Sequence, residues 1–231
     1  MANAIIMASG LGSRMRPLTY TTPKPLISVL GKPMVESVID ALNKIKVENI
    51  YIVVGYLKEQ FGYLTQKYKN VTLIENPDYE TINNISSIYY ARDKLLKGDT
   101  FICEADLYVA NQHLFCADLS HSCYFGKFVE GHSDDWVFDT DDNGFITRVG
   151  KYGDDLYNMV GISYFSAADS KILSEKISEA YGSSGYETLF WDDIVNRNLD
   201  ALRLRIHPVG KEDIYEIDTV EELSIINGEV K

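Results

Sequence analysis

The sequence predicts a three-layer α/β fold with a mixed, mainly parallel sheet and an inserted antiparallel section. Three observations predict it: apolar runs alternate with segments of helical spacing through the first half of the chain, a glycine-rich loop follows the first run, and shorter strand-like segments take over after about residue 120. Strands that are apolar throughout and separated by helices are typical of a parallel sheet that is covered on both faces.

The first half is expected to contain four buried strands with helices between them. Apolar residues at helical spacing predict one helix over Val35–Ile45, and Phe61, Leu64 and Tyr68 predict another. The strands are continuous apolar runs that end at glycine or polar residues. They are Ala4–Ala8, Ile50–Val54, Val71–Glu75 and Thr100–Glu104.

The second half is expected to contain short antiparallel strands, then two helices, a further strand and a closing helix that begins at Thr219. The tripeptide DNG at 142–144 is typical of a hairpin turn. Helices are predicted over Ala167–Tyr181 and Glu187–Asn196. The predicted strands are Cys123–Glu130, Trp136–Asp139, Phe145–Val149, Tyr157–Phe165 and Leu202–His207.

Composition places the chain among ordinary globular proteins. Of its 231 residues 45% are apolar and 24% are charged, and we see no repeat, low-complexity tract or linker, so we expect one domain over residues 1–231. No apolar run approaches the length of a membrane span, and the apolar start is too short for a signal peptide. Three cysteines at no metal-ligand spacing favour a reduced, cytoplasmic protein.

Charge is distributed unevenly along the chain. The net charge is −12, yet no acidic residue precedes Glu36, whereas Arg14, Arg16, Lys24 and Lys32 do. The first 35 residues therefore carry +4 and the remainder −16, because the two must sum to −12. Nucleic-acid phosphates attract clustered Lys and Arg, so an acidic protein is a poor match for them. A local positive segment instead favours a small anion that is held at one place.

The loop after the first strand is where an open α/β sheet binds its ligand. Gly10 and Gly12 lack a Cβ, so the backbone can approach a phosphate and turn its N–H groups toward it. The Gly-Lys-Ser/Thr ending of a P-loop is missing. A dinucleotide fingerprint needs a glycine at Met15 and an acid where Val54 and Gly55 stand. Neither of these motifs therefore explains the loop.

The string GLGSRMRPLT at 10–19, followed by PKPL at 23–26, resembles the signature of nucleotidylyltransferases that make sugar nucleotides and related activated alcohols. This resemblance, to the sugar-nucleotide pyrophosphorylase-like superfamily, implies a Rossmann-like fold of the nucleotide-diphospho-sugar transferase type. It also implies that Arg14 grips the β and γ phosphates of a nucleoside triphosphate and that Lys24 stabilises the α phosphate, roles that suit a planar fork of donors and a compact charge. Solvated loop charges are the alternative for both residues. The implied nucleotide-binding residues of the loop are Ala8, Gly10, Gly12, Ser13 and Arg14.

Two aspartates are candidate ligands for a divalent cation that would neutralise the phosphates. Asp106 follows the fourth predicted strand in ICEADLY, and Asp218 stands in YEIDTVEEL before the last predicted helix. Mg²⁺ prefers carboxylate oxygens, and the resemblance pairs both aspartates on one Mg²⁺, the cofactor expected here. An N-cap for the last helix is the alternative role of Asp218, and the two roles are compatible. Glu104 is a further acid that we place with the nucleotide-binding residues.

The segment TINNISSIYYA at 81–91 stands where sugar enzymes carry the Gly-Leu/Thr-Ala-x-Ala stretch that reads the base. It offers Asn84, Ser86 and Ser87 to the nucleotide. The Glu-Lys-Pro motif that holds a sugar phosphate in those enzymes is reduced to Lys151. This departure puts a sugar acceptor in doubt.

The stretches GYLKEQF, DDW, FWDD and IYEIDT look like bacterial CTP:phosphocholine cytidylyltransferases, and this resemblance covers nearly the full length, most strongly residues 4–90 and 186–220. A trimethylammonium group has no N–H to donate, so proteins hold it over aromatic faces, best tryptophan. The two tryptophans of the chain are both flanked by acids, although packing is the alternative role for either. The candidate acceptor-binding residues are Trp136, Lys151, Trp191, Asp192, Tyr215 and Glu216.

The expected function is Mg²⁺-dependent transfer of CMP from CTP to phosphocholine, which gives CDP-choline and pyrophosphate. An acceptor phosphate is already nucleophilic, so positioning and charge neutralisation suffice and no general base is needed. Three alternatives stay open: 2-aminoethylphosphonate or phosphoethanolamine as acceptor, a sugar 1-phosphate as acceptor, and a non-catalytic nucleotide-sensing module. We expect no nucleic-acid or membrane partner, and the oligomeric state is left open, a homodimer included.

Overall fold

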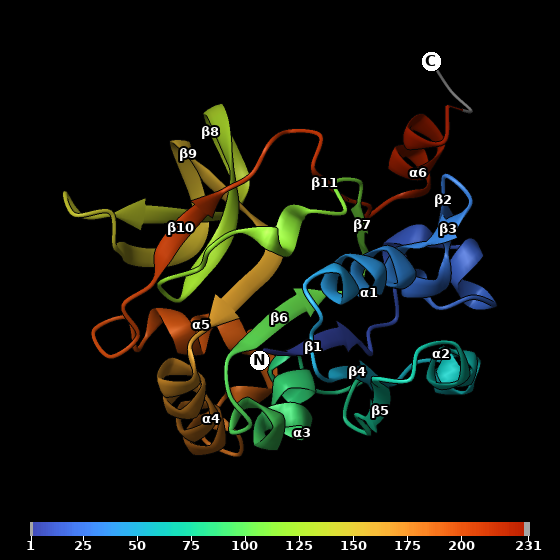
Figure 1. The fold of residues 1–231 in the computed structure, drawn as a ribbon, viewed down its shortest axis with the longest axis horizontal. Coiled ribbons are helices and arrows are strands. Elements are labelled where there is room, and N and C mark those ends of the chain that lie inside the picture. Colours follow the sequence, from blue (N-terminus) through green and yellow to red (C-terminus); the bar gives the residue numbers. More distant parts are fainter. Residues whose placement is uncertain (1, 229–231) are drawn as a thin grey trace.

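A seven-stranded sheet runs through the computed structural model, which describes residues 2–228 (Figure 1). In spatial order its strands are β10 (Arg205–Pro208), β8 (Cys123–Thr140), β9 (Ile146–Phe165), β6 (Thr100–Glu104), β1 (Asn3–Ala8), β4 (Ile50–Val54) and β5 (Val71–Glu75). Neighbouring strands are parallel in the series β6, β1, β4 and β5, and β10 is parallel to β8. β9 is antiparallel to both of its neighbours, β8 and β6. The predicted mixed, mainly parallel sheet with an antiparallel section is confirmed.

The parallel half of the sheet follows the apolar runs of the sequence. β4, β5 and β6 have the predicted bounds, and β1 begins one residue earlier than predicted. Alternate residues of β1 face opposite sides of the sheet: Ala4 and Ile6 pack in one core cluster and Ile5 in another. Ala8 at the end of β1 pairs with Val54 at the end of β4. The carboxyl ends of these strands therefore meet at one edge.

The antiparallel section is one long hairpin of β8 and β9, and the prediction of four short strands is wrong. The predicted turn at 142–144 is confirmed, and Gly144 N donates to Asp141 O at 2.9 Å. Register shifts at 129–132 and 133–136 interrupt the alternation of apolar and polar residues. Because these bulges break the pattern, the sequence looks like several separate strands.

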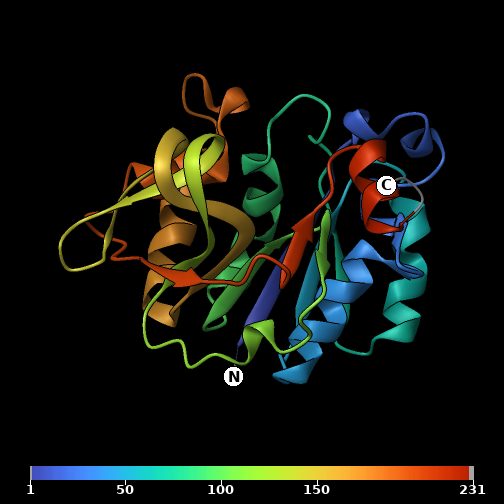
Figure 2. The same cartoon turned by 90° about the horizontal axis from the view of Figure 1, so that it is seen from above.

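Helices cover both faces of the sheet (Figure 1). They are α1 (Met34–Lys44), α2 (Gly62–Lys67), α3 (Ile85–Leu95), α4 (Ala167–Ala180), α5 (Trp191–Asn196) and α6 (Val220–Ile226). α1 and α2 pack in the cluster of Ala4 and Ile6, whereas α3, α4 and α5 pack in the cluster of Ile5. Figures 1 and 2 show α6 at the opposite end of the molecule from the β8–β9 hairpin. Short 3-10 turns lie at Ser13–Met15, Leu18–Tyr20, Lys24–Leu26, Lys58–Phe61, Leu114–Cys116 and Tyr186–Thr188.

The predicted helices at 35–45 and 167–181 are confirmed to within one residue. α6 begins one residue after the predicted start at Thr219, and Thr219 is its N-cap, so the alternative role of Asp218 as the N-cap is wrong. α3 was not predicted, because polar residues fill much of the segment around its buried positions. α5 begins at Trp191 instead of Glu187, since Leu189 and Phe190 have extended backbone and separate it from the 3-10 turn Tyr186–Thr188. β10 begins three residues later than the predicted strand.

Two small strand pairs lie outside the main sheet. They are β7 (Leu107–Val109) with β11 (Ile214–Glu216) and β2 (Ser28–Val29) with β3 (Lys32–Pro33). Ile217 N donates to Asp106 O at 3.1 Å, next to the β7–β11 pair. This pair therefore brings the end of β6 beside the segment that leads into α6. Within residues 2–228, no helix has the length and apolar character needed to cross a membrane.

Candidate active site

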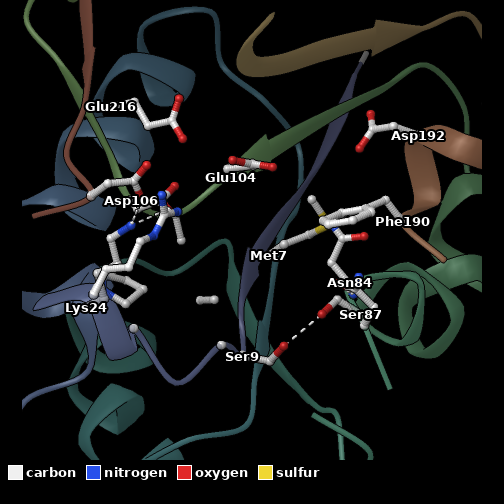
Figure 3. A pocket seen from close by; sticks show the side chains of 18 of the residues that line it. Met7, Ser9, Lys24, Asn84, Ser87, Glu104, Asp106, Phe190, Asp192 and Glu216 are labelled. Carbon is white, nitrogen blue, oxygen red and sulfur yellow. Dashed lines mark hydrogen bonds and ion pairs between the residues drawn. The ribbon is translucent and has the colours of Figure 1, made fainter. Parts of the chain in front are cut away.

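The residues predicted to bind substrate gather around a cavity at the carboxyl edge of the parallel strands. The cavity has a volume of about 600 Å³ and is lined by the ends of β1 and β6, the glycine loop, the start of α3, the β8–β9 hairpin and the segment before α5. Figure 3 shows Lys24 and Asp106 at one end, Phe190 and Asn84 at the other, and Glu104 between them. Open α/β sheets bind their ligands at this edge.

The glycine loop forms the wall next to β1. Gly12 has a φ of 61°, and a Cβ on it would lie 2.8 Å from Lys24 Cβ, so a larger residue would force a shift. The Thr19 hydroxyl donates to the Gly12 carbonyl at 2.9 Å and holds this turn. All the loop residues predicted to bind the nucleotide line the cavity: Ala8, Gly10, Gly12, Ser13 and Arg14.

Lys24 joins the two aspartates predicted to share a metal. Its Nζ lies 2.6 Å from Asp106 Oδ2 and 2.6 Å from Asp218 Oδ1, and Arg14 lies 2.7 Å from the same Asp218 oxygen. Burial acts to lower the pKa of the Lys24 ammonium, but the charges and hydrogen bonds of both aspartates outweigh it and raise that pKa. Lys24 is therefore a charged, buried bridge between two carboxylates.

The carboxylates around Asp106 fit an oxygen-ligated divalent cation. Asp106 Oδ1 is buried without a hydrogen-bond partner, while Oδ2 is bound to Lys24. Glu104, Asp106 and Glu216 each offer one oxygen, and these atoms lie within 4.8 Å of one another. Mg²⁺ takes such ligands. Glu104 and Glu216, which the sequence analysis assigned to other roles, are thus candidate ligands alongside Asp106 and Asp218.

Four carboxylates that line the cavity form no ion pair within residues 2–228: Glu104, Asp135, Asp192 and Glu216. Asp135 lies beside Trp136 on β8. We call the other three, Glu104, Asp192 and Glu216, the cavity carboxylates. Desolvation raises the pKa of Glu104 well above its usual range, aided by the charges of Asp106 and Glu216. Glu216 is open to the cavity, but the surrounding walls still desolvate it. This desolvation, together with the nearby aspartate charges, raises the pKa of Glu216 to about 8. Burial raises the pKa of Asp192 to about 7, although Tyr124 donates to it at 2.8 Å.

An aromatic pair forms the wall opposite the glycine loop. Trp136 on β8 lines the cavity and packs edge-to-face with Phe190, with ring centroids 5.4 Å apart. Lys151 on β9 lies beside both rings. Sequence reasoning missed Phe190, and its place directly before the quoted acidic WDD stretch was the available signal.

Trp191 and Tyr215 do not line the cavity, in contrast to the prediction for acceptor-binding residues. Trp191 is 3% exposed and stacks on Tyr124 in the core, because the helical turn at the start of α5 directs it inward while Asp192 lines the cavity. Tyr215 packs under α6, because successive residues of a strand point to opposite sides and Glu216 takes the cavity side.

The residues predicted to contact the nucleotide base, Asn84, Ser86 and Ser87, line the cavity. Hydrogen bonds to residues behind them hold them in place. Asn76, which is 1% exposed and was not predicted, donates from Nδ2 to Ser86 Oγ at 2.9 Å and to the hydroxyls of Ser87 and Ser9 at 3.3 Å each. Asn84 Oδ1 accepts from the Trp191 N–H at 3.0 Å, which ties the start of α3 to the start of α5. This hydrogen bond thus connects two walls of the cavity. The nucleotide wall contains Asn84, Ser86 and Ser87, and the acceptor wall contains Trp136, Phe190 and Asp192.

Comparison with known proteins assigns a family to this fold and cavity. The family model described as nucleotidyl transferase matches residues 3–130. A 2-aminoethylphosphonate cytidylyltransferase of Lancefieldella rimae is 58% identical over 222 residues, which cover 96% of this chain and 90% of that protein. A choline-phosphate cytidylyltransferase of Streptococcus pneumoniae is 34% identical and covers 95% of this chain and 94% of its own length.

Solved structures are similar over the whole chain. The CTP:phosphocholine cytidylyltransferase of Streptococcus pneumoniae has a TM-score of 0.91 and 33% identity, and the match covers 100% of this chain and 99% of that one. The inositol-1-phosphate CTP transferase of T. maritima has a TM-score of 0.74 at 18% identity, covering 100% of this chain and 98% of that one, a likeness of fold alone.

Proposed function

The chain belongs to the nucleotidyl transferase family, and from that premise we propose that this cytidylyltransferase transfers CMP from CTP to 2-aminoethylphosphonate and releases pyrophosphate. The observation that carries the choice of acceptor is the set of cavity carboxylates, which have no cation partner in the described residues. A primary ammonium brings one positive charge and three N–H donors, which such carboxylates can accept. The 58% identity to the enzyme from Lancefieldella rimae supports the same acceptor.

Phosphocholine, the acceptor expected from the sequence, is not confirmed and is the second candidate. Trp136 and Phe190 offer aromatic faces to a trimethylammonium group, and the similarity to the Streptococcus pneumoniae enzyme favours it. Trp191, however, is buried in the core, so only one of the two tryptophans is available for a cage. Asp192 lines the same wall as Trp136 and Phe190 and forms no ion pair in the described residues, which favours the primary amine.

At the nucleotide end, the glycine loop and Arg14 would bind the triphosphate, and Lys24 would stabilise the charge that builds up on the α phosphate. A phosphonate oxygen of the acceptor attacks the α phosphorus in line. The new O–P bond forms as the bond from the α phosphorus to the bridging oxygen breaks, and pyrophosphate leaves. The attacking oxygen is already anionic, so no side chain has to remove a proton.

A bound Mg²⁺ would neutralise phosphate charge during this transfer. Glu104, Asp106 and Glu216 would hold it, because each offers an oxygen and these atoms lie within 4.8 Å of one another. Asp218, which is bound to Lys24 and Arg14, is the further ligand expected from the sequence. Figure 3 shows Glu216 beside Asp106, and Glu104 between Asp106 and the Phe190 end of the cavity. Asp192 belongs to the acceptor wall alone and is the carboxylate that we assign to the ammonium group.

Pyrophosphate release tests the proposal directly. We would combine each of the four common nucleoside triphosphates with 2-aminoethylphosphonate, phosphocholine, phosphoethanolamine and glucose 1-phosphate, with and without Mg²⁺. We expect the highest kcat/KM for CTP with 2-aminoethylphosphonate and a requirement for Mg²⁺. A higher value for phosphocholine would replace the acceptor, and release with glucose 1-phosphate alone would overturn the amino-acceptor assignment. Absence of release with every pair would favour a nucleotide sensor.

A further inference from the structure

Lys151 lies where the aromatic pair of the cavity would hold a cation. It is directly opposite Trp136 in the β8–β9 pairing. Its Nζ is 6.0 Å from the centroid of the Trp136 ring and 5.8 Å from that of the Phe190 ring. An ammonium group at this distance from aromatic faces is attracted by the ring quadrupoles. The aromatic pair therefore already has a resident cation that belongs to the protein.

The backbone around Lys151 is held in place by Arg148. Arg148 donates from Nη1 to the Lys151 carbonyl at 3.2 Å and from Nη2 to the Tyr152 carbonyl at 3.1 Å, and it is paired with Asp139 on β8. Tyr152 has a φ of 68°, a left-handed backbone conformation within β9 directly after Lys151. Strand pairing and the two hydrogen bonds from Arg148 keep the base of the Lys151 side chain beside the rings.

The wall that holds Lys151 carries charges of both signs. Lys151 forms no ion pair within the described part of the chain, although Asp134 and Asp135 line the same wall. The cavity carboxylates, which include Asp192, likewise lack a cation there. The cavity thus offers an aromatic position that a protein ammonium occupies and an acidic position that is open to a ligand.

We propose that Lys151 is a specificity-determining residue that keeps trimethylammonium acceptors away from Trp136 and Phe190 and so favours a primary amine; this inference rests on the function proposed above. A trimethylammonium group needs the aromatic faces, because it cannot donate hydrogen bonds to carboxylates. On those faces it meets like-charge repulsion from the Lys151 ammonium. A primary ammonium avoids this repulsion by binding at the cavity carboxylates.

The test is Lys151→Met, which keeps a long apolar side chain and removes the charge. We would measure kcat/KM with saturating CTP for 2-aminoethylphosphonate and for phosphocholine. The ratio of the first value to the second should fall roughly two- to fivefold, the size of a cation–π effect at an exposed site, because the Lys151 side chain is exposed. Any contact of Lys151 with the acid group that both acceptors share cancels in this ratio.

Two controls accompany this variant. Lys97→Met is the matched control, because Lys97 also lies over an aromatic ring, 5.5 Å from the centroid of Tyr51, but outside the cavity. It should leave the ratio unchanged. Lys151→Arg keeps the positive charge and should keep the ratio close to that of the wild type. Thermal unfolding of each variant shows whether it is folded.

A binding measurement separates this inference from the proposed function. Trp136 lines the cavity and Trp191 is buried, so choline alone can be titrated against tryptophan fluorescence. We expect choline to quench Lys151→Met at roughly two- to fivefold lower concentration than the wild type. An unchanged ratio together with an unchanged titration would overturn the role of Lys151. If the wild type uses neither amino acceptor, the proposed function fails, yet the titration still decides whether Lys151 excludes the trimethylammonium group.

Discussion

Lys24 at the nucleotide end of the cavity is paired with two aspartates, whereas Asp192 and Lys151 at the acceptor end form no ion pair in the described residues. At the nucleotide end, Lys24 is bound to Asp106 and Asp218 at 2.6 Å each. At the acceptor end, Asp192 has no cation and Lys151 has no anion among the residues that the structure describes. Groups that stabilise a transition state work best when their positions are set in advance. Unpaired groups instead indicate where the charges of the substrate complete the site.

This difference matches how the family resemblance is distributed. The family model covers residues 3–130, which contain the glycine loop, Lys24 and Asp106. Trp136, Lys151 and the start of α5 lie beyond it. In the proposed function, the nucleotide is therefore bound mainly by the part of the chain that the family model covers, with Asp218 as an exception, and the acceptor is recognised by elements that follow it.

The largest effect is expected from removing the charge of Lys24 at the nucleotide end of the cavity, the paired end. Lys24→Met should lower kcat on the order of a hundred- to a thousandfold, as expected for loss of one preorganised group that stabilises phosphate charge. It also leaves Asp106 and Asp218 without their shared cation, so Tm should fall. Steady-state kinetics with CTP and thermal unfolding measure both. Wild-type kcat in this variant would mean that the paired end is not where catalysis occurs.

A smaller effect, confined to binding of the acceptor, is expected from removing the charge of Asp192 at the acceptor end of the cavity, the unpaired end. Asp192→Asn keeps the shape but removes the charge that we assign to the ammonium group, so KM for the acceptor should rise about 10- to 100-fold while KM for CTP stays constant. Asp193→Asn is the matched control, because Asp193 accepts from Phe190 N at 2.8 Å and does not line the cavity. Equal rises in both KM values would contradict the division into two ends.

The pH dependence sharpens the same comparison. Burial raises the pKa of Asp192 from 3.8 to about 7, and only its ionised form attracts an ammonium group. KM for the acceptor should therefore fall as the pH rises through about 7, and this fall should be absent in Asp192→Asn. The folded state binds this proton more tightly than the unfolded state, so the Asp192 contribution to stability declines as the pH rises from 3.8 to about 7. Asp192→Asn should accordingly be more stable than the wild type above neutral pH in thermal unfolding without substrate.

The smallest effect on activity is expected behind the nucleotide wall. Asn76→Ala removes an amide that donates to three buried hydroxyls, those of Ser9, Ser86 and Ser87. Unfolding in denaturant should show a loss of about 1–3 kcal/mol, the net value of two or three hydrogen bonds. The hydroxyls keep other partners, because Ser9 and Ser87 bond to each other at 2.7 Å and Ser86 donates to the Asn83 carbonyl at 2.9 Å. KM for CTP should rise modestly with kcat nearly unchanged. A large fall in kcat would instead place Asn76 in the catalytic machinery.

Sequence patterns determined the strands β1, β4, β5 and β6, the glycine loop at their edge and the position of most helices. These features are local: an apolar run of five or six residues, or a spacing of three and four, specifies the backbone whatever lies far away in the chain. The same locality explains the errors. The bulges in β8 and β9 and the polar positions of α3 interrupt the pattern without interrupting the element.

Only the tertiary structure decided which charges meet. Lys24 reaches Asp106 over 82 residues of chain and Asp218 over 194, and the β7–β11 pairing that allows this has no local signal. Tertiary packing also placed Trp191 in the core and brought Phe190 beside Trp136. A residue's type shows which charge or ring it can offer, but whether that group is already paired depends on neighbours that the sequence does not place next to it.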